Sequence, residues 1–302
     1  MKDCLEKRKS FTLIELLVVI VIIGILAGVI MISTSSSINK ADLAKGQAFS
    51  STLNNELFSD LVSEWTFEED SGTLIKDTWG SNNGTAYNTP QSLSGSKCVF
   101  GKCLQFSGST SYVEVADSNS LDIQNAITLA AWIKTTSTAQ QLIIQKSANS
   151  TFVDPWRLYS LLLTDESSKL KSRFSLSTGV AGSQIQLKGN TGLNLNEWYF
   201  IVGTWQSGSK ARIFLNGKED YPGGMTFAGP IAVNSELFRM ANSPTNTERF
   251  YGVIDDTRIY NKMFTTAEVK QNYIAGLNSL LSKNLISKED YNEKINALAY
   301  EE

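Results

Sequence analysis

The chain of 302 residues contains no histidine, and it has five prolines and three cysteines. Without an imidazole there is no general base for a serine or cysteine nucleophile, so catalytic triads of that kind are excluded. A zinc site would lack histidine ligands and would have too few cysteines. No basic stretch follows residue 32 and the formal net charge is -3, which argues against a nucleic-acid partner.

The N-terminus, in contrast, is rich in bases and is followed by a long apolar run. Lys2, Lys7, Arg8 and Lys9 precede residues 11–32, which read FTLIELLVVIVIIGILAGVIMI. As a helix this run would rise about 33 Å, which is enough to cross a bilayer and longer than the apolar core of a cleaved secretory signal. The charges predict a single-pass segment whose N-terminus is cytoplasmic and whose remainder faces outward.

One acidic residue, Glu15, interrupts the apolar run. A carboxylate inside a spanning helix costs about 2.5 to 3.5 kcal/mol, so its position suggests a partner. The alternative is an uncleaved anchor in which Glu15 stays hydrated near the cytoplasmic interface.

The leader, Ser10 and the FTLIE sequence together resemble the signature of type IV pilins and pseudopilins. The resemblance implies that a prepilin peptidase cuts between Ser10 and Phe11 and that the new amine of Phe11 is methylated. It further implies that Glu15 neutralises the amine of a neighbouring subunit, which makes the N-terminal helix the site of homo-oligomerisation. The family usually has glycine before the cut, where this chain has Ser10.

The pattern changes near residue 62. Short strand-like runs separated by Gly, Ser, Asn and Asp continue to about residue 260 and predict an antiparallel β-sandwich. The runs ITLAAWIK and WYFIVGTW are apolar on both faces, so we expect central strands there. Asn216 and Gly217 predict a tight hairpin turn. The expected domains are a leader (1–10), a helix (11–61) with Leu61 on its apolar stripe, a sandwich (62–263) and a helical hairpin (264–302).

The order of these runs resembles the concanavalin A-like jelly roll of laminin-G type. Relatives of this fold bind glycans or proteins or act as spacers, and some are glycosidases, so the fold alone does not choose. Retaining glycosidases of this fold carry closely spaced acids in an E-x-D-x-E pattern, which is absent here. We therefore expect a protein that is not an enzyme.

Cys98 and Cys103 flank Gly101 in the run SKCVFGKCLQF. Outside the cytoplasm such a pair is expected to form a disulfide across a tight turn, although two free thiols remain the alternative.

A structural calcium ion is a further expectation, because laminin-G-like relatives commonly join an early oxygen-rich loop to an acid on the last strand. The predicted ligands are Asp77, Asn82, Thr85, Asp255 and Asp256. By alternation, Asp255 would share the core-facing side with Val253, Thr257 and Ile259. In the alternative, the loop residues only build turns, and Asp255 caps backbone amides or meets Arg258.

Binding of a sugar needs exposed aromatic rings beside polar groups. The aromatic residues in loop-like segments are the candidates, with ordinary packing as the alternative: Trp79, Tyr87, Trp156 and Tyr221. The remaining tryptophans lie in strand-like runs and are expected in the core: Trp65, Trp132, Trp198 and Trp205.

The C-terminal tail is expected to be helical. Thr265 and Glu268 have the spacing of a capping box, and Ser287 is placed to begin a second helix. Two short helices over residues 265–299 would pack on the sandwich or on a partner subunit, or form a mobile appendage.

These observations predict a membrane-anchored, exported filament subunit of type IV pilin type whose head binds a glycan or protein ligand at the cell surface. The alternatives are a pseudopilin of a type II secretion or DNA-uptake system, and a monomeric anchored lectin-like protein.

Replacing Glu15 with Gln tests the role of the N-terminal carboxylate. The neutral side chain cannot pair with a neighbouring amine, so we expect correctly trimmed subunits that yield few or no sheared surface filaments in electron microscopy. N-terminal sequencing checks the trimming. Filaments at normal yield from E15Q would contradict the pairing.

Overall fold

The computed structural model describes residues 59–69, 72–108, 110–149, 153–166 and 169–299. The chain divides into two compact units, Met1–Glu56 and Leu57–Glu302, and every described residue belongs to the second. Ser10, Phe11 and Glu15 lie outside the described residues. Among the helices of the described ranges, none is long and apolar enough to cross a bilayer, and the predicted span at residues 11–32 is not among them.

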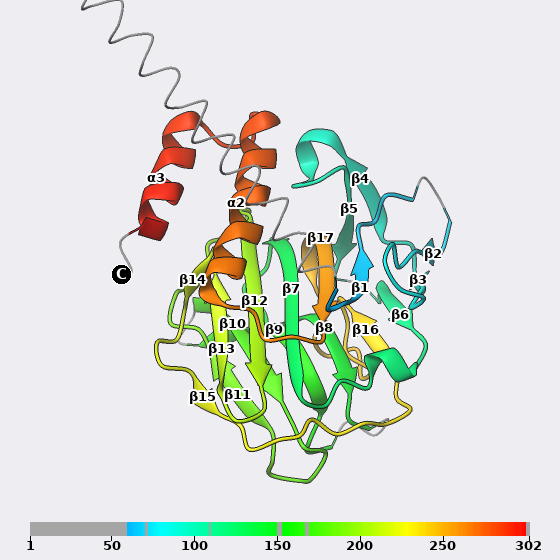
Figure 1. Ribbon diagram of the computed structural model, residues 1–302. Coiled ribbons are helices and arrows are strands. Elements are labelled where there is room, and N and C mark those ends of the chain that lie inside the picture. Colours follow the sequence, from blue (N-terminus) through cyan, green and yellow to red (C-terminus); the bar gives the residue numbers. More distant parts are fainter. Residues whose placement is uncertain (1–58, 70–71, 109, 150–152, 167–168, 300–302) are drawn as a thin grey trace, which may run out of the picture. The chain divides into compact units, whose positions relative to one another are not determined.

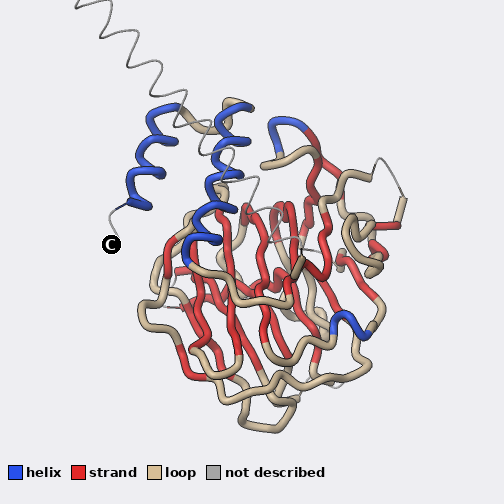
Figure 2. The backbone as a smooth tube through the Cα atoms, viewed as in Figure 1, coloured by secondary structure: helices blue, strands red, loops and turns tan. Residues whose placement is uncertain are grey.

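Two antiparallel sheets stack on each other (Figures 1 and 2). Sheet A has the order β14-β13-β12-β7-β17-β5-β4, with β1 added beside β17 and β15 beside β13. Its strands are β1 (Leu61–Trp65), β4 (Gln91–Ser94), β5 (Lys102–Ser107), β7 (Ala126–Thr135), β12 (Tyr199–Gln206), β13 (Lys210–Leu215), β14 (Lys218–Glu219), β15 (Met225–Thr226) and β17 (Tyr251–Tyr260). The apolar runs predicted to be central form β7 and β12, which confirms that prediction.

Sheet B has the order β11-β10-β9-β8-β16-β6-β3-β2. Its strands are β2 (Leu74–Ile75), β3 (Gly84–Tyr87), β6 (Tyr112–Val115), β8 (Gln141–Ser147), β9 (Arg157–Glu166), β10 (Lys169–Leu176), β11 (Ile185–Lys188) and β16 (Phe238–Met240). Two short 3-10 turns lie between strands: η1 (Gly95–Lys97) joins β4 to β5 within sheet A, and η2 (Asn119–Leu121) joins β6 of sheet B to β7 of sheet A. The inner faces of both sheets form one apolar core, which includes Trp65, Trp205 and Phe174.

The alternation of side chains on β13 and its turn agree with the sequence. Ala211, Ile213 and Leu215 all lie in the core between the sheets. Asn216 and Gly217 both have positive φ angles, 52° and 82°, which a two-residue hairpin turn of type I′ requires. This turn joins β13 to β14.

Leu61 departs from the prediction. It begins β1 and pairs with Tyr260 of β17, so the sandwich starts one residue before the expected boundary and Leu61 is not helical. Its side chain is buried in the apolar cluster that includes residues of the C-terminal helices. The helical apolar stripe on which the sequence placed Leu61 gave no sign of this strand pairing.

Two helices, α2 (Thr266–Ser282) and α3 (Lys288–Ala299), form the C-terminal hairpin and lie outside the strand layers (Figure 2). Thr265 and Glu268 make the predicted capping box. Helix α2 covers the outer face of sheet A, where Tyr273 stacks on Trp132 with ring centroids 5.6 Å apart. Gly276 permits this approach, because a Cβ there would lie 2.0 Å from the Trp132 ring. The hairpin therefore packs on the sandwich, which is one of the three arrangements that the sequence left open.

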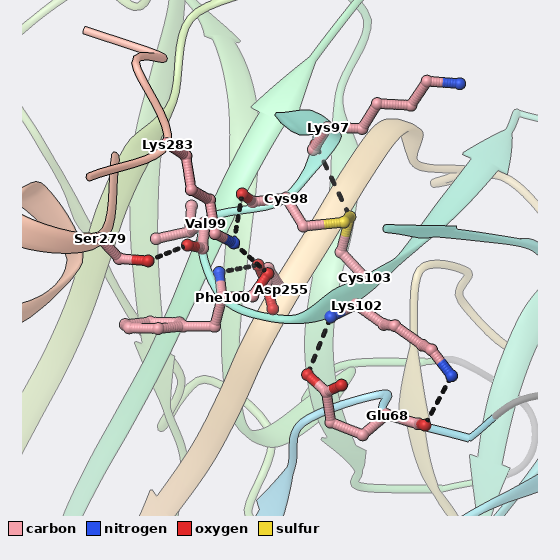
Figure 3. Close-up of a disulfide and its surroundings, with 10 residues drawn as sticks. All are labelled: Glu68, Lys97, Cys98, Val99, Phe100, Lys102, Cys103, Asp255, Ser279 and Lys283. Atoms are coloured by element: carbon pink, nitrogen blue, oxygen red, sulfur yellow. Dashed lines mark hydrogen bonds between the residues drawn. A yellow bond between two sulfur atoms is a disulfide. The ribbon is translucent and has the colours of Figure 1, made fainter. Parts of the chain in front are cut away.

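The predicted disulfide joins Cys98, in the loop after β4, to Cys103 at the start of β5 (Figure 3). Lys283, the residue that caps the C-terminus of α2, donates from Nζ to the carbonyl oxygens of Phe100 (2.8 Å) and Cys98 (3.2 Å). On the other side of the loop, the Lys102 amide donates to Glu68 Oε1 at 2.8 Å. The bridge thus closes a loop that precedes β5 and is hydrogen-bonded to the C-terminal end of α2.

Replacing both Cys98 and Cys103 with serine removes this cross-link. Closing so short a loop contributes about 2 kcal/mol by chain entropy, so we expect the free energy of unfolding to fall by about that amount in urea denaturation. A reductant should lower the stability of the original protein to match, while Cys4→Ser serves as a control that changes nothing. An unchanged urea midpoint in the double variant would contradict the stabilising role.

Candidate ligand-binding site

The two outer faces of the sandwich differ in chemistry. Helix α2 buries an apolar patch on the outer face of sheet A, whereas one cross-strand row on the outer face of sheet B is polar throughout. In spatial order this row is Thr85, Glu114, Arg239, Gln145, Ser160, Ser175 and Gln186. Most chain neighbours of these residues belong to the core between the sheets, as alternation along a strand requires.

A pocket of about 400 Å³ opens at the β11 end of this polar row. It is lined by Gln140, Trp156, Arg157, Arg173, Gln186, Thr247 and Glu248. We call it the arginine pocket. Strands β9, β10 and β11 supply the two arginines and Gln186, and loop 241–249, between β16 and β17, supplies Thr247 and Glu248.

Glu248 is buried between the two arginine side chains. Its Oε2 pairs with Nη2 of Arg157, and its Oε1 accepts a hydrogen bond from Nε2 of Gln140 and lies 3.8 Å from Nη2 of Arg173. The side chains of Arg157, Arg173 and Glu248 are only 1%, 6% and 8% exposed. A charge this deeply buried requires such partners.

The backbone of loop 241–249 is fixed where it supplies Glu248. The Glu248 amide donates to Ser243 Oγ at 3.2 Å, and the Leu142 amide of β8 donates to the Glu248 carbonyl oxygen at 3.2 Å. The Ala241 amide donates to the Ile143 carbonyl oxygen at 2.9 Å. The loop is therefore bonded to β8 at both ends, which positions the carboxylate over the arginines.

Burial changes the proton affinity of both arginines. Desolvation, together with repulsion from Arg157, lowers the pKa of Arg173 to about 10, while Glu248 raises it. Desolvation also lowers the pKa of Arg157, and the charge and hydrogen bond of Glu248 oppose this change. Arginine keeps its proton at neutral pH in proteins, so two positive charges face the one carboxylate of Glu248.

The structure does not gather the four predicted ligand-binding aromatics into one site. Trp156 is 36% exposed and lines the arginine pocket. Trp79 is 48% exposed and lines a separate polar cleft of about 800 Å³ beside residues 59–62 and 119–126. Tyr87 stacks on Tyr112 with ring centroids 4.9 Å apart, and Tyr221 lies between β14 and β15. Among the four, only Trp156 meets buried charged groups in a pocket.

Sequence reasoning missed Arg157, Arg173, Gln186 and Glu248. The available signal was a charged residue inside a run that is otherwise strand-like, WRLYSLLL for Arg157 and LKSRFSL for Arg173. Glu248 gave no such signal, because it lies in a polar loop and meets Arg157 over a separation of 91 residues.

Among the predicted calcium ligands, Asp77 and Asn82 do lie together. Asp77 Oδ1 accepts hydrogen bonds from the amides of Glu64 (2.9 Å), Trp79 (3.1 Å) and Gly80 (2.8 Å), and its Oδ2 accepts from the Asn82 amide (3.0 Å). These bonds match the alternative in which the loop acid builds a turn.

The Asn82 side chain is likewise engaged, and Thr85 is elsewhere. Asn82 Nδ2 donates to Ser63 Oγ at 2.7 Å, and its Oδ1 accepts from Ser118 Oγ at 2.6 Å. Thr85 is exposed on β3. In the described ranges no group of three or more acidic or cysteine side chains is placed to hold one metal ion. Calcium binding stays a prediction, which a calcium titration of the melting temperature tests.

A β-bulge separates Asp255 from Asp256. The pairing of β17 with β7 shifts register between Asp255 and Arg258, and Asp256 has a φ of 47°. Asp255 Oδ2 accepts a hydrogen bond from the Phe100 amide at 2.9 Å (Figure 3), whereas Asp256 Oδ1 pairs with Arg258 Nη2 at 3.0 Å. The two carboxylates therefore serve different partners.

Because of the bulge, the prediction that Val253, Asp255, Thr257 and Ile259 share the core-facing side is wrong. Ile259 lies in the core between the sheets, but Val253 packs against the disulfide on the outer face of sheet A. Asp255 shares this outer face, because it bonds to the disulfide loop. The inserted residue reverses the side of every position that follows, and alternation read from sequence cannot anticipate it.

A family model described as the concanavalin A-like lectin/glucanases superfamily matches residues 107–270. A second model, the prokaryotic N-terminal methylation motif, matches residues 6–31. No curated protein sequence matches the chain.

Several solved structures share the fold. The ligand-binding domain of botulinum neurotoxin serotype D, in complex with N-acetylneuraminic acid, is 13% identical with a TM-score of 0.57, and the match covers 74% of this chain and 52% of that one. The binding domain of Paraclostridial Mosquitocidal Protein 1 is 16% identical with a TM-score of 0.53, covering 74% and 53%. This chain thus spans about half the length of each toxin domain.

A third structure is matched over nearly its whole length. Domain 4 of an extracellular arabinanase from Geobacillus stearothermophilus, in complex with arabinotriose, is 18% identical with a TM-score of 0.50. The match covers 70% of this chain and 97% of that one. At these identities the likeness concerns the fold.

The buried Asp255 predicts a pH dependence of stability. Burial raises the pKa of Asp255 to about 7, although amide hydrogen bonds and Lys283 lower it. The folded state therefore keeps a proton that the unfolded state loses above about pH 4, so this group's contribution to stability falls as the pH rises toward 7.

Asp255→Asn removes this titration. We expect the difference in melting temperature, D255N minus the original protein, to become more positive from pH 4 to pH 7 and to level off above pH 7. The exposed Asp165→Asn is the matched control and should show no such trend. A difference that does not vary with pH would contradict the raised pKa.

Proposed function

This chain belongs to the concanavalin A-like lectin/glucanase superfamily, and we propose that it is a subunit of a type IV pilus-like filament whose β-sandwich binds a glycan at the cell surface. The methylation motif at residues 6–31 supports membrane-anchored, surface-displayed export. The filament role rests on that motif, and the binding role rests on the arginine pocket.

The arginine pocket carries the proposal of glycan binding. Its opening on the outer face of sheet B presents the Trp156 ring, against which the C–H face of a sugar packs favourably. Gln140, Gln186 and the arginines supply the few convergent polar groups that orient a ligand in a pocket of this size. The sugars in two of the matched structures, N-acetylneuraminic acid and arabinotriose, support this ligand class.

We propose binding rather than catalysis at this site. Glycoside hydrolysis commonly uses two carboxyl groups on either side of the bond that is cut. Among the described residues that line the pocket, Glu248 is the single acid, and its oxygens already meet Arg157 and Gln140. A pseudopilin or an unassembled anchored lectin would share the export motif. Surface filaments that contain this protein, recovered by shearing, would favour the filament subunit over both alternatives.

Trp156→Ala tests the site. Full-length protein in detergent, applied to a glycan array, should bind its best ligand about 10-fold more weakly after the substitution. Packing of a sugar ring on an aromatic ring contributes on the order of 1 kcal/mol, and the ring also shapes the pocket. Trp79→Ala, which removes an equally large ring from the other cleft, should bind normally. The reverse pattern would place ligand binding in the cleft of Trp79.

A further inference from the structure

The surroundings of the arginine pocket carry more positive than negative charge. Two guanidinium groups face one carboxylate, that of Glu248. Lys188 of β11 lies opposite Arg173 in the strand register, and Lys171 is two residues along β10, so both lysines share the same outer face. These lysines pair with one acid, Glu166, at 3.3 and 3.0 Å. The chain as a whole is negative, at -3, so this excess is local.

Arg173 has hydrogen-bonding capacity that the described part of the protein does not use. Its Nη1 donates to Gln186 Oε1 at 3.2 Å, while its Nη2 lies 3.8 Å from Glu248 Oε1, which is beyond hydrogen-bond reach. Its Nε is buried and has no hydrogen-bond partner among the described residues. The side chain is 6% exposed and lines the pocket.

The two unused groups, Nε and Nη2, lie on one edge of the guanidinium plane. Two parallel N–H groups on such an edge match the two oxygens of a carboxylate, which they bind in a bidentate manner. Gln186 holds the guanidinium through Nη1, and the Glu248 carboxylate attracts it across 3.8 Å without a hydrogen bond. This edge therefore offers two parallel hydrogen-bond donors to a planar anion such as a carboxylate.

We infer that the arginine pocket binds a carboxylated sugar, with the carboxylate on the Nε–Nη2 edge of Arg173 and the sugar ring against Trp156. This inference rests on the proposed function and names the ligand class for the same site. The sugar is an acidic one, such as a hexuronate or a sialic acid, because the pocket combines an aromatic face with an uncompensated positive charge.

Matched pairs of glycans test the ligand class on the full-length protein in detergent. The probes are 6′-sialyllactose against lactose, and oligogalacturonate against its methyl ester, with 6′-sulfolactose as a sulfated arm. We expect at least one carboxylated probe to bind about 10-fold or more tightly than its neutral counterpart, since a hydrogen bond to a charged group is worth about that factor. The preference should weaken as salt is added.

Variants of Arg173 connect this preference to the pocket. Arg173→Gln should abolish the preference for the carboxylated probe, and Arg173→Lys, which keeps the charge without the two-pronged edge, should restore only part of it. Arg212→Gln removes the same charge from a partly exposed residue of β13 in sheet A and should not change the preference. Melting temperatures identify any variant that fails to fold, and the paired probes on the original protein remain decisive in that case.

The possible failures are distinguishable. Equal binding of neutral and carboxylated probes, with both lost in Trp156→Ala, would overturn the acidic ligand and leave glycan binding intact. A preference for the sulfated arm, or a preference that survives Arg173→Gln, would also overturn the inference. Absence of binding to these probes and to a broad glycan array would overturn both the inference and the proposed function.

Discussion

The pairing of the buried Glu248 carboxylate with Arg157 and Arg173 is the constraint on which the site depends. None of these three charges is stable at this depth alone, and removing one partner of a buried ion pair typically destabilises a protein by about 3 to 5 kcal/mol. Their mutual attraction holds loop 241–249 over sheet B and fixes both guanidinium groups. A rigid, charged pocket at the surface is the result.

The sandwich is asymmetric, which determines where this pocket can be. Ala130, Trp132 and Phe200 give sheet A an apolar outer face, and α2 covers it. The outer face of sheet B has no such patch along its polar cross-strand row, so hairpin 266–299 has no apolar surface to bury there. One face is therefore covered by α2, and the arginine pocket opens on the opposite one.

Much of the fold could be predicted from local patterns. The central strands β7 and β12, the turn at Asn216, the helical hairpin and the bridge between Cys98 and Cys103 each follow from a few adjacent residues. The pocket could not be predicted in the same way. Its arginines meet through the register of neighbouring strands, its acid comes from a distant loop, and neither relation is recorded in local sequence. Trp156 was found because an aromatic residue in a loop is visible without the fold, and the bulge at Asp256 was hidden because one inserted residue leaves no local sign.

The central claim is that a glycan occupies the arginine pocket. The most direct measurement is a titration of the full-length protein in detergent micelles with its best-bound glycan, followed by NMR of the tryptophan indole and arginine Nε–H groups. The account predicts that the Trp156 indole and the Arg173 Nε–H resonances shift together at saturating glycan while that of Trp79 does not move. A shift at Trp79, with the resonances of Trp156 and Arg173 unchanged, would contradict the account.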